Sequence, residues 1–141
     1  MISFNYETDF LLDNEEAYEV WLSQVIVSEM KKEGEIYYIF CDDDYLVEIN
    51  QQYLNHDTLT DIISFDYSIG NELHGDIFIS IERVRENASD FAVTFEDELK
   101  RVLVHGVLHY CGYKDKSEED EQIMRAKEEE KMQLFHVKHN S

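Results

Sequence analysis

The sequence has 141 residues, of which 32 are acidic and 12 are basic, so its formal net charge at neutral pH is -20. This charge favours solubility and argues against a general binder of anionic surfaces. Any contact with nucleic acid must therefore come from a few clustered cations or from a metal. The length predicts one compact domain over residues 1–141.

The two cysteines, Cys41 and Cys111, lie in apolar runs, as buried free thiols often do, and they indicate no disulfide framework. The N-terminal residues lack a basic region followed by a long apolar run. No stretch approaches about 18 uninterrupted apolar residues. We therefore expect a cytoplasmic protein that is neither secreted nor embedded in a membrane.

The spacing of apolar and polar residues predicts strands interspersed with helices. In chain order we expect a strand at 2–6, a helix at 15–32 capped by Asn14 and closed by Gly34, a strand at 35–41, a helix at 43–54, strands at 61–68 and 74–81, and helices at 82–91, 94–111 and 117–135. The turn signal Ile69-Gly70-Asn71 indicates that the last two strands pair antiparallel. The expected fold class is α+β, with a small mixed β-sheet of about four strands packed with about five helices.

Local signals mark the ends of the last two helices. Thr94 with Asp97, and Ser117 with Asp120, form [ST]-x-x-[DE] boxes that begin helices, and Gly112 is a plausible stop. The run EEDEQIMRAKEEEKM contains Glu-to-Lys spacings that support an exposed helix, so we interpret it mainly as a solvated face.

The segment HGVLHYCGYKD, residues 105–115, places His105 and His109 four residues apart in an apolar helix. Such residues share one helix face, with Cβ atoms about 5–6 Å apart, so both imidazoles can bind one ion. The spacing alone also fits packing or hydrogen-bonding histidines. Gly106 inside the helix suggests a close approach of backbone from another element. After the helix stop, Asp115 lies where a returning loop can bring a carboxylate to the same ion.

A His-His-Asp set leaves an open position for water, which distinguishes a catalytic zinc site from a closed structural one. The signature of zinc peptidases is absent, because Gly106 stands where H-E-x-x-H sites have their glutamate base. The sequence therefore predicts a site for one Zn²⁺ at the end of a central helix.

Three blocks of the sequence resemble a known family. HGVLHYCGYKD resembles the H-G-x-L-H-x-x-G-Y-x-[HD] signature of the YbeY family, which are bacterial metal-dependent endoribonucleases implicated in ribosomal RNA maturation and ribosome quality control. TDIISF at 60–65 is similar to the family's T-[DN]-V-L-S-F strand, and HGDIFIS at 74–80 to its G-D-[IV]-x-I-[SC] strand. The order and separation of the blocks match too, over about residues 45–130.

The resemblance implies that His105, His109 and Asp115 are both the metal ligands and the catalytic residues, although most members have histidine at the third position. It implies a zinc-dependent endoribonuclease, specific for single strands, that hydrolyses phosphodiester bonds with a metal-activated water. The implied role is 16S rRNA 3′ end maturation and ribosome quality control. The implied partners are single-stranded RNA and ribosomal RNA, not DNA, with ribosomal subunit proteins as further candidates. Aspartate is an acceptable zinc ligand but should make the ion less Lewis-acidic.

A second departure from the family concerns a cation. Many members have an arginine associated with activity where this chain has Leu54. Lys114, Lys116 and a protonated His56 are candidates for the missing cation. Each of them also fits an ordinary surface residue. Several cations lie near the metal segment in the sequence and form either a local positive groove or scattered solvated charges. They are Arg83, Arg85, Lys100, Arg101 and Lys114.

Ser64, Asp76 and Lys114 are the candidate substrate-binding residues. Neither Ser64 nor Asp76 need have a role in the site. Ser64 also fits a buried hydroxyl satisfied by backbone, and Asp76 also fits a carboxylate at the end of a strand. Two other functions remain open. One is a non-catalytic ribosome assembly factor with a structural metal, which Leu54 favours somewhat, and the other is a metal-dependent hydrolase of another substrate class.

Overall fold

The computed structural model describes residues 1–54 and 60–138. Along these residues the elements are β1 (Ile2–Tyr6), α1 (Glu15–Ser28), β2 (Lys32–Cys41), α2 (Asp43–Leu54), β3 (Ile62–Asp66), β4 (Glu72–Ser80), α3 (Ile81–Asp90), α4 (Phe95–Tyr110) and α5 (Glu118–Lys138). The expected α+β class, with four strands and five helices, is confirmed. None of the helices in the described ranges combines the length and the apolar character needed to cross a membrane.

The strands form one mixed sheet in the order β1-β2-β4-β3. Strand β2 pairs in parallel with β1 on one side and with β4 on the other. A parallel pair needs a crossover, which α1 supplies between β1 and β2. Strand β3 pairs antiparallel with β4, from Ile62 opposite Ile79 to Asp66 opposite Gly75, so the predicted hairpin is confirmed.

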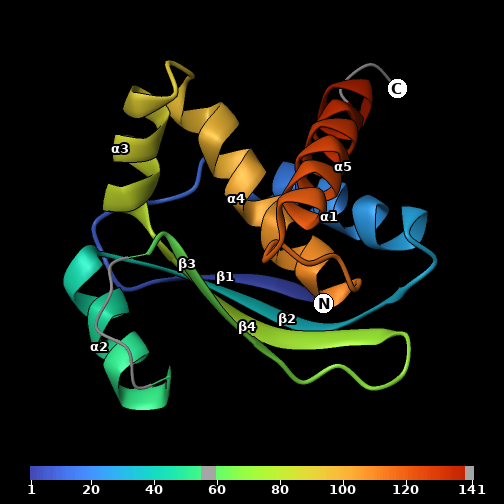
Figure 1. The fold of residues 1–141 in the computed structure, drawn as a ribbon, viewed down its shortest axis with the longest axis horizontal. Helices are drawn as coiled ribbons and strands as arrows, with labels where there is room; N and C mark the ends of the chain where they lie inside the picture. Colours follow the sequence, from blue (N-terminus) through green and yellow to red (C-terminus); the bar gives the residue numbers. More distant parts are fainter. Residues whose placement is uncertain (55–59, 139–141) are drawn as a thin grey trace.

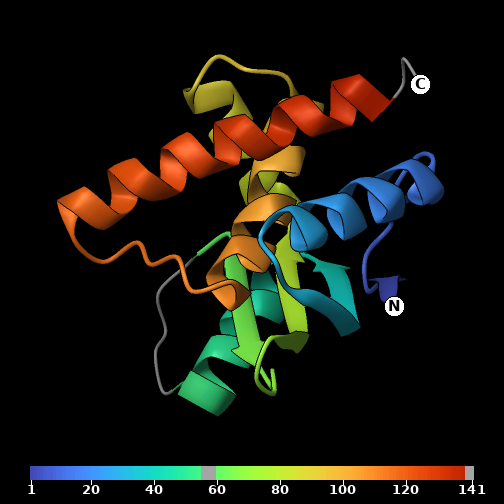
Figure 2. The same cartoon turned by 90° about the vertical axis from the view of Figure 1, so that its right-hand side faces the viewer.

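The helices cover the sheet unequally. Helices α1, α3, α4 and α5 lie on one face, and α2 lies on the other (Figure 1). Helix α4 is central, because it packs against β3 and β4 of the sheet and also against α1, α3 and α5 (Figure 2). Its apolar residues are buried nearly all round; they are Leu99, Val102, Leu103, Val104, Val107 and Leu108. Burial on this scale fixes the position of the helix that carries the two histidines.

Two predictions about the first helix are wrong. Helix α1 ends at Ser28, and the chain leaves it through Met30, which has a φ of 62°. Gly34 lies inside β2 instead, where a Cβ atom would overlap the carbonyl oxygen of Leu73, so glycine is required by close packing and not by a helix end. Asn14 precedes the helix in the left-handed conformation, with a φ of 60°, and its side chain makes no capping bond.

The starts predicted for α4 and α5 and the stop predicted for α4 are confirmed, whereas α5 runs to Lys138, beyond the predicted 135. The Thr94 hydroxyl accepts a hydrogen bond from the backbone N–H of Asp97 at 3.1 Å. The Ser117 hydroxyl accepts a hydrogen bond from the backbone N–H of Asp120 at 3.0 Å. Gly112 follows α4 with a φ of 108°, a left-handed conformation that favours glycine, and so lets the chain turn back.

Helix α5 is more than a solvated face. Met124, Glu128 and Lys131 of this helix are buried. The Trp21 indole on α1 donates a hydrogen bond to the Lys131 carbonyl at 2.8 Å, and the Lys131 ammonium lies 2.8 Å from Glu29. The prediction of a mainly solvated face is wrong for this side of α5, because its charged groups are buried and paired with partly buried groups on other elements.

Two glycines mark where α4 packs most closely against the sheet. A Cβ atom at Gly106 would come within 2.9 Å of Ile77 Cδ1, so a side chain of the sheet approaches the helix here, and not its backbone as predicted. A Cβ atom at Gly75 would overlap the Tyr110 hydroxyl and the carbonyl oxygen of Phe65. That hydroxyl donates a hydrogen bond to the Phe65 carbonyl at 2.8 Å, so the end of α4 is tied to β3.

Replacing Gly75 with alanine is expected to lower the free energy of unfolding by about 3 kcal/mol, because the new methyl group displaces Tyr110 or the β3 backbone. Urea unfolding followed by circular dichroism measures the change. Gly70→Ala is the matched control, since Gly70 has a φ of 61° but open space where the Cβ would lie. It should cost about 1 kcal/mol, and equal losses at the two positions would contradict the packing argument.

Candidate metal centre

One stripe of the central helix carries polar side chains. Arg101, His105 and His109 follow one another at a spacing of four and therefore share one face of α4. Their side chains are 17%, 14% and 31% exposed, whereas the apolar side chains on the other faces are buried. This stripe is the face of α4 on which chemistry can take place.

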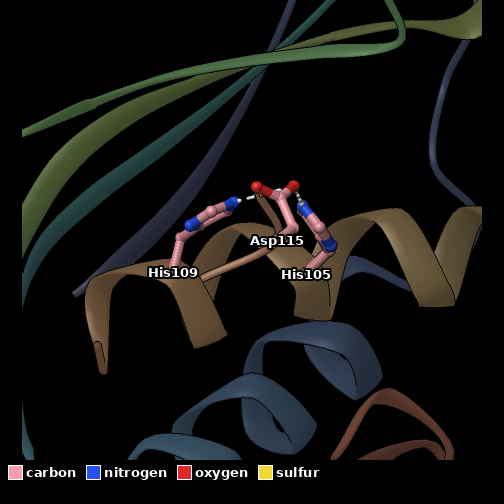
Figure 3. A group of neighbouring side chains, drawn as sticks. All are labelled: His105, His109 and Asp115. Carbon is pink, nitrogen blue, oxygen red and sulfur yellow. Dashed lines mark hydrogen bonds and ion pairs between the residues drawn. The ribbon is translucent and has the colours of Figure 1, made fainter. Parts of the chain in front are cut away.

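The loop after α4 brings Asp115 against the two histidines (Figure 3). Asp115 Oδ2 lies 3.3 Å from His105 Nε2 and 3.3 Å from His109 Nε2, and the three atoms all lie within 4.8 Å of one another. In a tetrahedral zinc site with bonds of about 2.0–2.1 Å, the ligand atoms are about 3.3–3.4 Å apart. Two of the three separations already have this value, and the third is no longer than 4.8 Å. The three side chains therefore fit one divalent ion.

The chemistry of these side chains also suits zinc. Two imidazole nitrogens and one carboxylate oxygen are common zinc ligands, and three protein ligands leave a fourth position open. The Asp115 and His109 side chains are 40% and 31% exposed, so the set is accessible from one side. A site of this kind can admit water and substrate.

Glu128 of α5 orients His105 from the opposite side. Its Oε2 lies 2.7 Å from His105 Nδ1, and its side chain is only 2% exposed. A carboxylate in this position accepts the proton of Nδ1, which leaves the lone pair of Nε2 directed toward Asp115. Pairs of this type fix both the tautomer and the ring orientation of metal-binding histidines.

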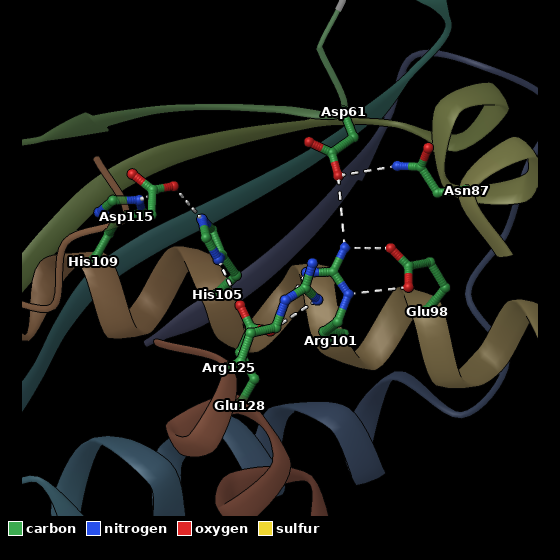
Figure 4. A network of polar contacts seen from close by, with 9 residues as sticks. All are labelled: Asp61, Asn87, Glu98, Arg101, His105, His109, Asp115, Arg125 and Glu128. Atoms are coloured by element: carbon green, nitrogen blue, oxygen red, sulfur yellow. Dashed lines mark hydrogen bonds and ion pairs between the residues drawn. The ribbon is translucent and has the colours of Figure 1, made fainter. Parts of the chain in front are cut away.

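Arg101 compensates the buried carboxylates around it. Its Nη1 lies 3.4 Å from Glu128 Oε1, its Nε donates to Glu98 Oε1 at 3.0 Å, and its Nη2 lies 4.0 Å from Asp61 (Figure 4). Burial alone lowers the pKa of Arg101, but the hydrogen bonds and charge of Glu98, with the charges of Glu128 and Asp61, raise it above its ordinary value. Arg101 is therefore a permanently charged structural residue of the site.

The three candidate metal ligands, His105, His109 and Asp115, line a cavity of about 410 Å³. Its walls come from β3 with Ser64, α3 with Asn87, and α5 with Glu121 and Arg125, besides the polar stripe of α4. The volume is sufficient for a phosphate group and part of a nucleotide.

The three predicted substrate-binding residues lie in different places. Ser64 lines the cavity together with the metal ligands. Lys114 is exposed and is not among the described residues that line this cavity. Asp76 lies on the other face of the sheet, in a separate hollow with Tyr37. Successive strand residues point to opposite faces, and since the neighbouring Ile77 packs toward α4, Asp76 points away from the metal site.

The cations of the cavity come from α4 and α5. Leu54 ends α2, is 43% exposed and does not belong to the described part of the cavity wall. Lys116, like Lys114, is exposed outside that wall, and His56 lies outside the described residues. Arg125 lines the cavity but was not among the residues predicted from the sequence, because it is one of many charged residues in its helix. Glu128 was not predicted for the same reason. Its spacing of four from the apolar Met124 was the available signal, because residues four apart share one helix face.

Neither cysteine is suited to the metal centre. Both are free thiols, Cys41 buried and Cys111 partly buried. Burial raises the pKa of Cys41 to about 12 and that of Cys111 to about 11. Because the thiolate is the form that binds metal, both side chains are poor ligands at neutral pH.

Comparison with known proteins identifies the family. A family model described as Endoribonuclease YbeY matches residues 3–136. The chain belongs to the YbeY family. Among relatives named Endoribonuclease YbeY, that of Flavobacterium psychrophilum is 74% identical over 140 residues, which are 99% of this chain and 100% of the relative. That of Flavobacterium johnsoniae is 71% identical over 137 residues, 97% of this chain and 99% of the relative.

A solved structure shows a similar fold. The solution structure of a Thermotoga maritima protein matches with a TM-score of 0.66 and 25% sequence identity, covering 99% of this chain and 92% of the other. The resemblance to the YbeY family that three sequence blocks predicted is thus confirmed over nearly the whole chain. The names of the family and of its members confirm the expected enzyme class, an endoribonuclease and hence a hydrolase.

Replacing Glu128 with glutamine is expected to weaken Zn²⁺ binding about 10–100-fold, because the amide no longer accepts the His105 proton as a charged group does. Competition with a chelating dye measures the affinity. Glu129→Gln, at the neighbouring exposed position, is the matched control and should bind zinc like the parent. Equal affinities for the two variants would show that Glu128 does not orient the ligand.

The stability of the protein is expected to depend on the charge of Asp76. Burial raises the pKa of this carboxyl group, so the folded state holds its proton more tightly than the unfolded state. At neutral pH the charged form therefore costs stability, and Asp76→Asn should raise the free energy of unfolding. The gain should shrink as the pH falls through the raised pKa toward the unfolded value of about 3.9. Urea unfolding across this range, with the exposed Asp9→Asn as control, checks the direction, and a gain independent of pH would contradict it.

Proposed function

We propose that the chain is a zinc-dependent, single-strand-specific endoribonuclease that acts in 16S rRNA 3′ end maturation and in ribosome quality control. The observation that carries the proposal is the placement of His105, His109 and Asp115 at the edge of an accessible cavity. The family name supports RNA as the substrate. Hydrolysis of a phosphodiester bond is the reaction that this combination of ligands and cavity suits best.

The chain's own residues prepare the site for that reaction. A bound divalent ion supplies a polarised water and a positive charge beside a phosphoryl oxygen. Glu128 lies 2.7 Å from His105 Nδ1 and favours the tautomer that is protonated there, while Nε2 lies beside Asp115. The buried faces of α4 keep both histidines in place, which reduces the reorganisation needed when substrate enters.

An aromatic side chain supports a preference for single strands. Phe91, just after α3, lines the cavity and is 54% exposed. Exposed aromatic rings of this kind stack on unpaired bases, whereas the bases of a duplex are stacked on one another and are not available. Ser64 and Asn87 add polar groups on neighbouring walls of the cavity.

Zinc-loaded protein is expected to cleave an unstructured RNA while leaving a DNA strand of the same sequence and an RNA duplex intact. His109→Ala should lower the cleavage rate at least about a hundredfold, because metal chemistry contributes several kcal/mol. Gel analysis of end-labelled RNA measures the rates. His74→Ala, on the other face of the sheet, is the control and should retain activity.

The same experiment tests the alternative of a non-catalytic assembly factor. If the zinc-loaded parent does not cut unstructured RNA, while His109→Ala still associates with ribosomes, the nuclease proposal is wrong. In that case the metal braces the fold and the partners provide the affinity for RNA.

A further inference from the structure

We propose that Arg125 is the residue that binds the phosphate of the RNA at the metal centre. This inference rests on the proposed function and adds a substrate-binding residue to the same site. It begins from a difference between the two arginines in the described part of the cavity wall, Arg101 and Arg125.

The donors of Arg101 are already occupied. Its side chain is 17% exposed and interacts with Glu98, Glu128 and Asp61. The Glu98 and Glu128 side chains are each only 2% exposed, so their charges need a partner inside the protein. If Arg101 turned toward a substrate, it would leave buried carboxylates uncompensated. It is therefore unsuited to bind a phosphate.

The donors of Arg125 are largely available. Its side chain is 56% exposed, and its one ion pair with a described residue is to Glu128 Oε1 at 3.6 Å. That distance is longer than the about 2.7–2.9 Å of a charge-assisted hydrogen bond, and Arg101 lies closer to the same oxygen, at 3.4 Å. A guanidinium group has five N–H donors in a planar fork. Arg125 can therefore present a pair of donors to another anion.

The position of Arg125 connects it to the metal ligands. It lies on α5, three residues before Glu128, and Glu128 contacts His105 through its other oxygen (Figure 4). The same cavity contains Arg125, His105, His109 and Asp115. A phosphate group in this cavity can thus be reached from the histidine side and from the arginine side.

The charge of the cavity makes such a residue necessary. Four carboxylates contribute to its wall, namely Asp61, Asp115, Glu121 and Glu128. A phosphodiester that enters the cavity meets these negative charges in addition to the net charge of the whole chain. The planar fork of an arginine matches two phosphate oxygens, and the buried carboxylate beside Arg125, that of Glu128, is already paired with Arg101 and His105.

Binding of a labelled RNA tests the inference without depending on cleavage. The probe is a fluorescein-labelled oligouridylate, and the parent for this assay is His109→Ala, which should not consume it. Arg125→Gln in this background is expected to weaken binding about tenfold, because a hydrogen-bonded charge pair with the phosphate is lost. The slope of log affinity against log salt should fall by about 0.7, the value for one phosphate contact on a single strand. Fluorescence anisotropy over a series of KCl concentrations measures both quantities.

Two further variants separate charge from geometry. Arg125→Lys should keep the salt slope but recover only part of the affinity, because an ammonium group does not reproduce the planar fork. Arg85→Gln is the matched control, since Arg85 is an exposed arginine that lines a different hollow, beside Asp9. Its affinity and slope should equal those of the parent.

A purely structural role for Arg125 predicts a different result. If the residue only supports Glu128, then Arg125→Gln in the otherwise unchanged chain should lose zinc affinity, while RNA binding keeps its salt slope. That outcome, or an unchanged affinity for the oligouridylate, overturns the inference and leaves the proposed function intact. If the parent binds no oligouridylate and the unchanged zinc-loaded chain cuts no RNA, the proposed function and this inference fail together.

Discussion

The buried contact between Glu128 and His105 is the interaction on which the site depends. A carboxylate removed from water is costly unless it is paired, and Glu128 is paired through both oxygens, to His105 at 2.7 Å and to Arg101 at 3.4 Å. These partners lie on α4, so the packing of α5 against α4 also orients a candidate metal ligand. One turn further along the same buried side of α5, the hydrogen bond from the Trp21 indole to the Lys131 carbonyl holds the helix in the register that this contact needs.

A chain with a net charge of -20 that acts on a polyanion must confine its attraction for RNA to a small region. Long-range repulsion disfavours non-specific binding over most of its surface. Within the cavity, the metal ligands, Phe91 and the arginine side of α5 face a common space. Selectivity is then a consequence of charge, because an RNA segment that cannot enter the cavity gains nothing from contact with the rest of the protein.

The parts of the structure that depend on local sequence could be predicted, and those that depend on distant partners could not. The spacing of His105 and His109, and the caps at Thr94 and Ser117, involve neighbours within one or two helical turns. The role of Glu128 depends on a residue 23 positions away, and nothing in a run of charges shows which one is buried. The position of Asp76 could not be predicted either. The alternation of residues along a strand shows which side chains share a face of the sheet, but not which face packs against α4.

The order of the site along the chain has a consequence for its biosynthesis. The two histidines lie on α4, while Asp115 and Glu128, which complete and orient the ligand set, follow later in the chain. The two histidines are synthesised first, and His105 gains the partner that orients it only when α5 has emerged and packed against α4. We therefore expect the nascent chain, while it is still beside ribosomal RNA, to cleave RNA only weakly until α5 is in place.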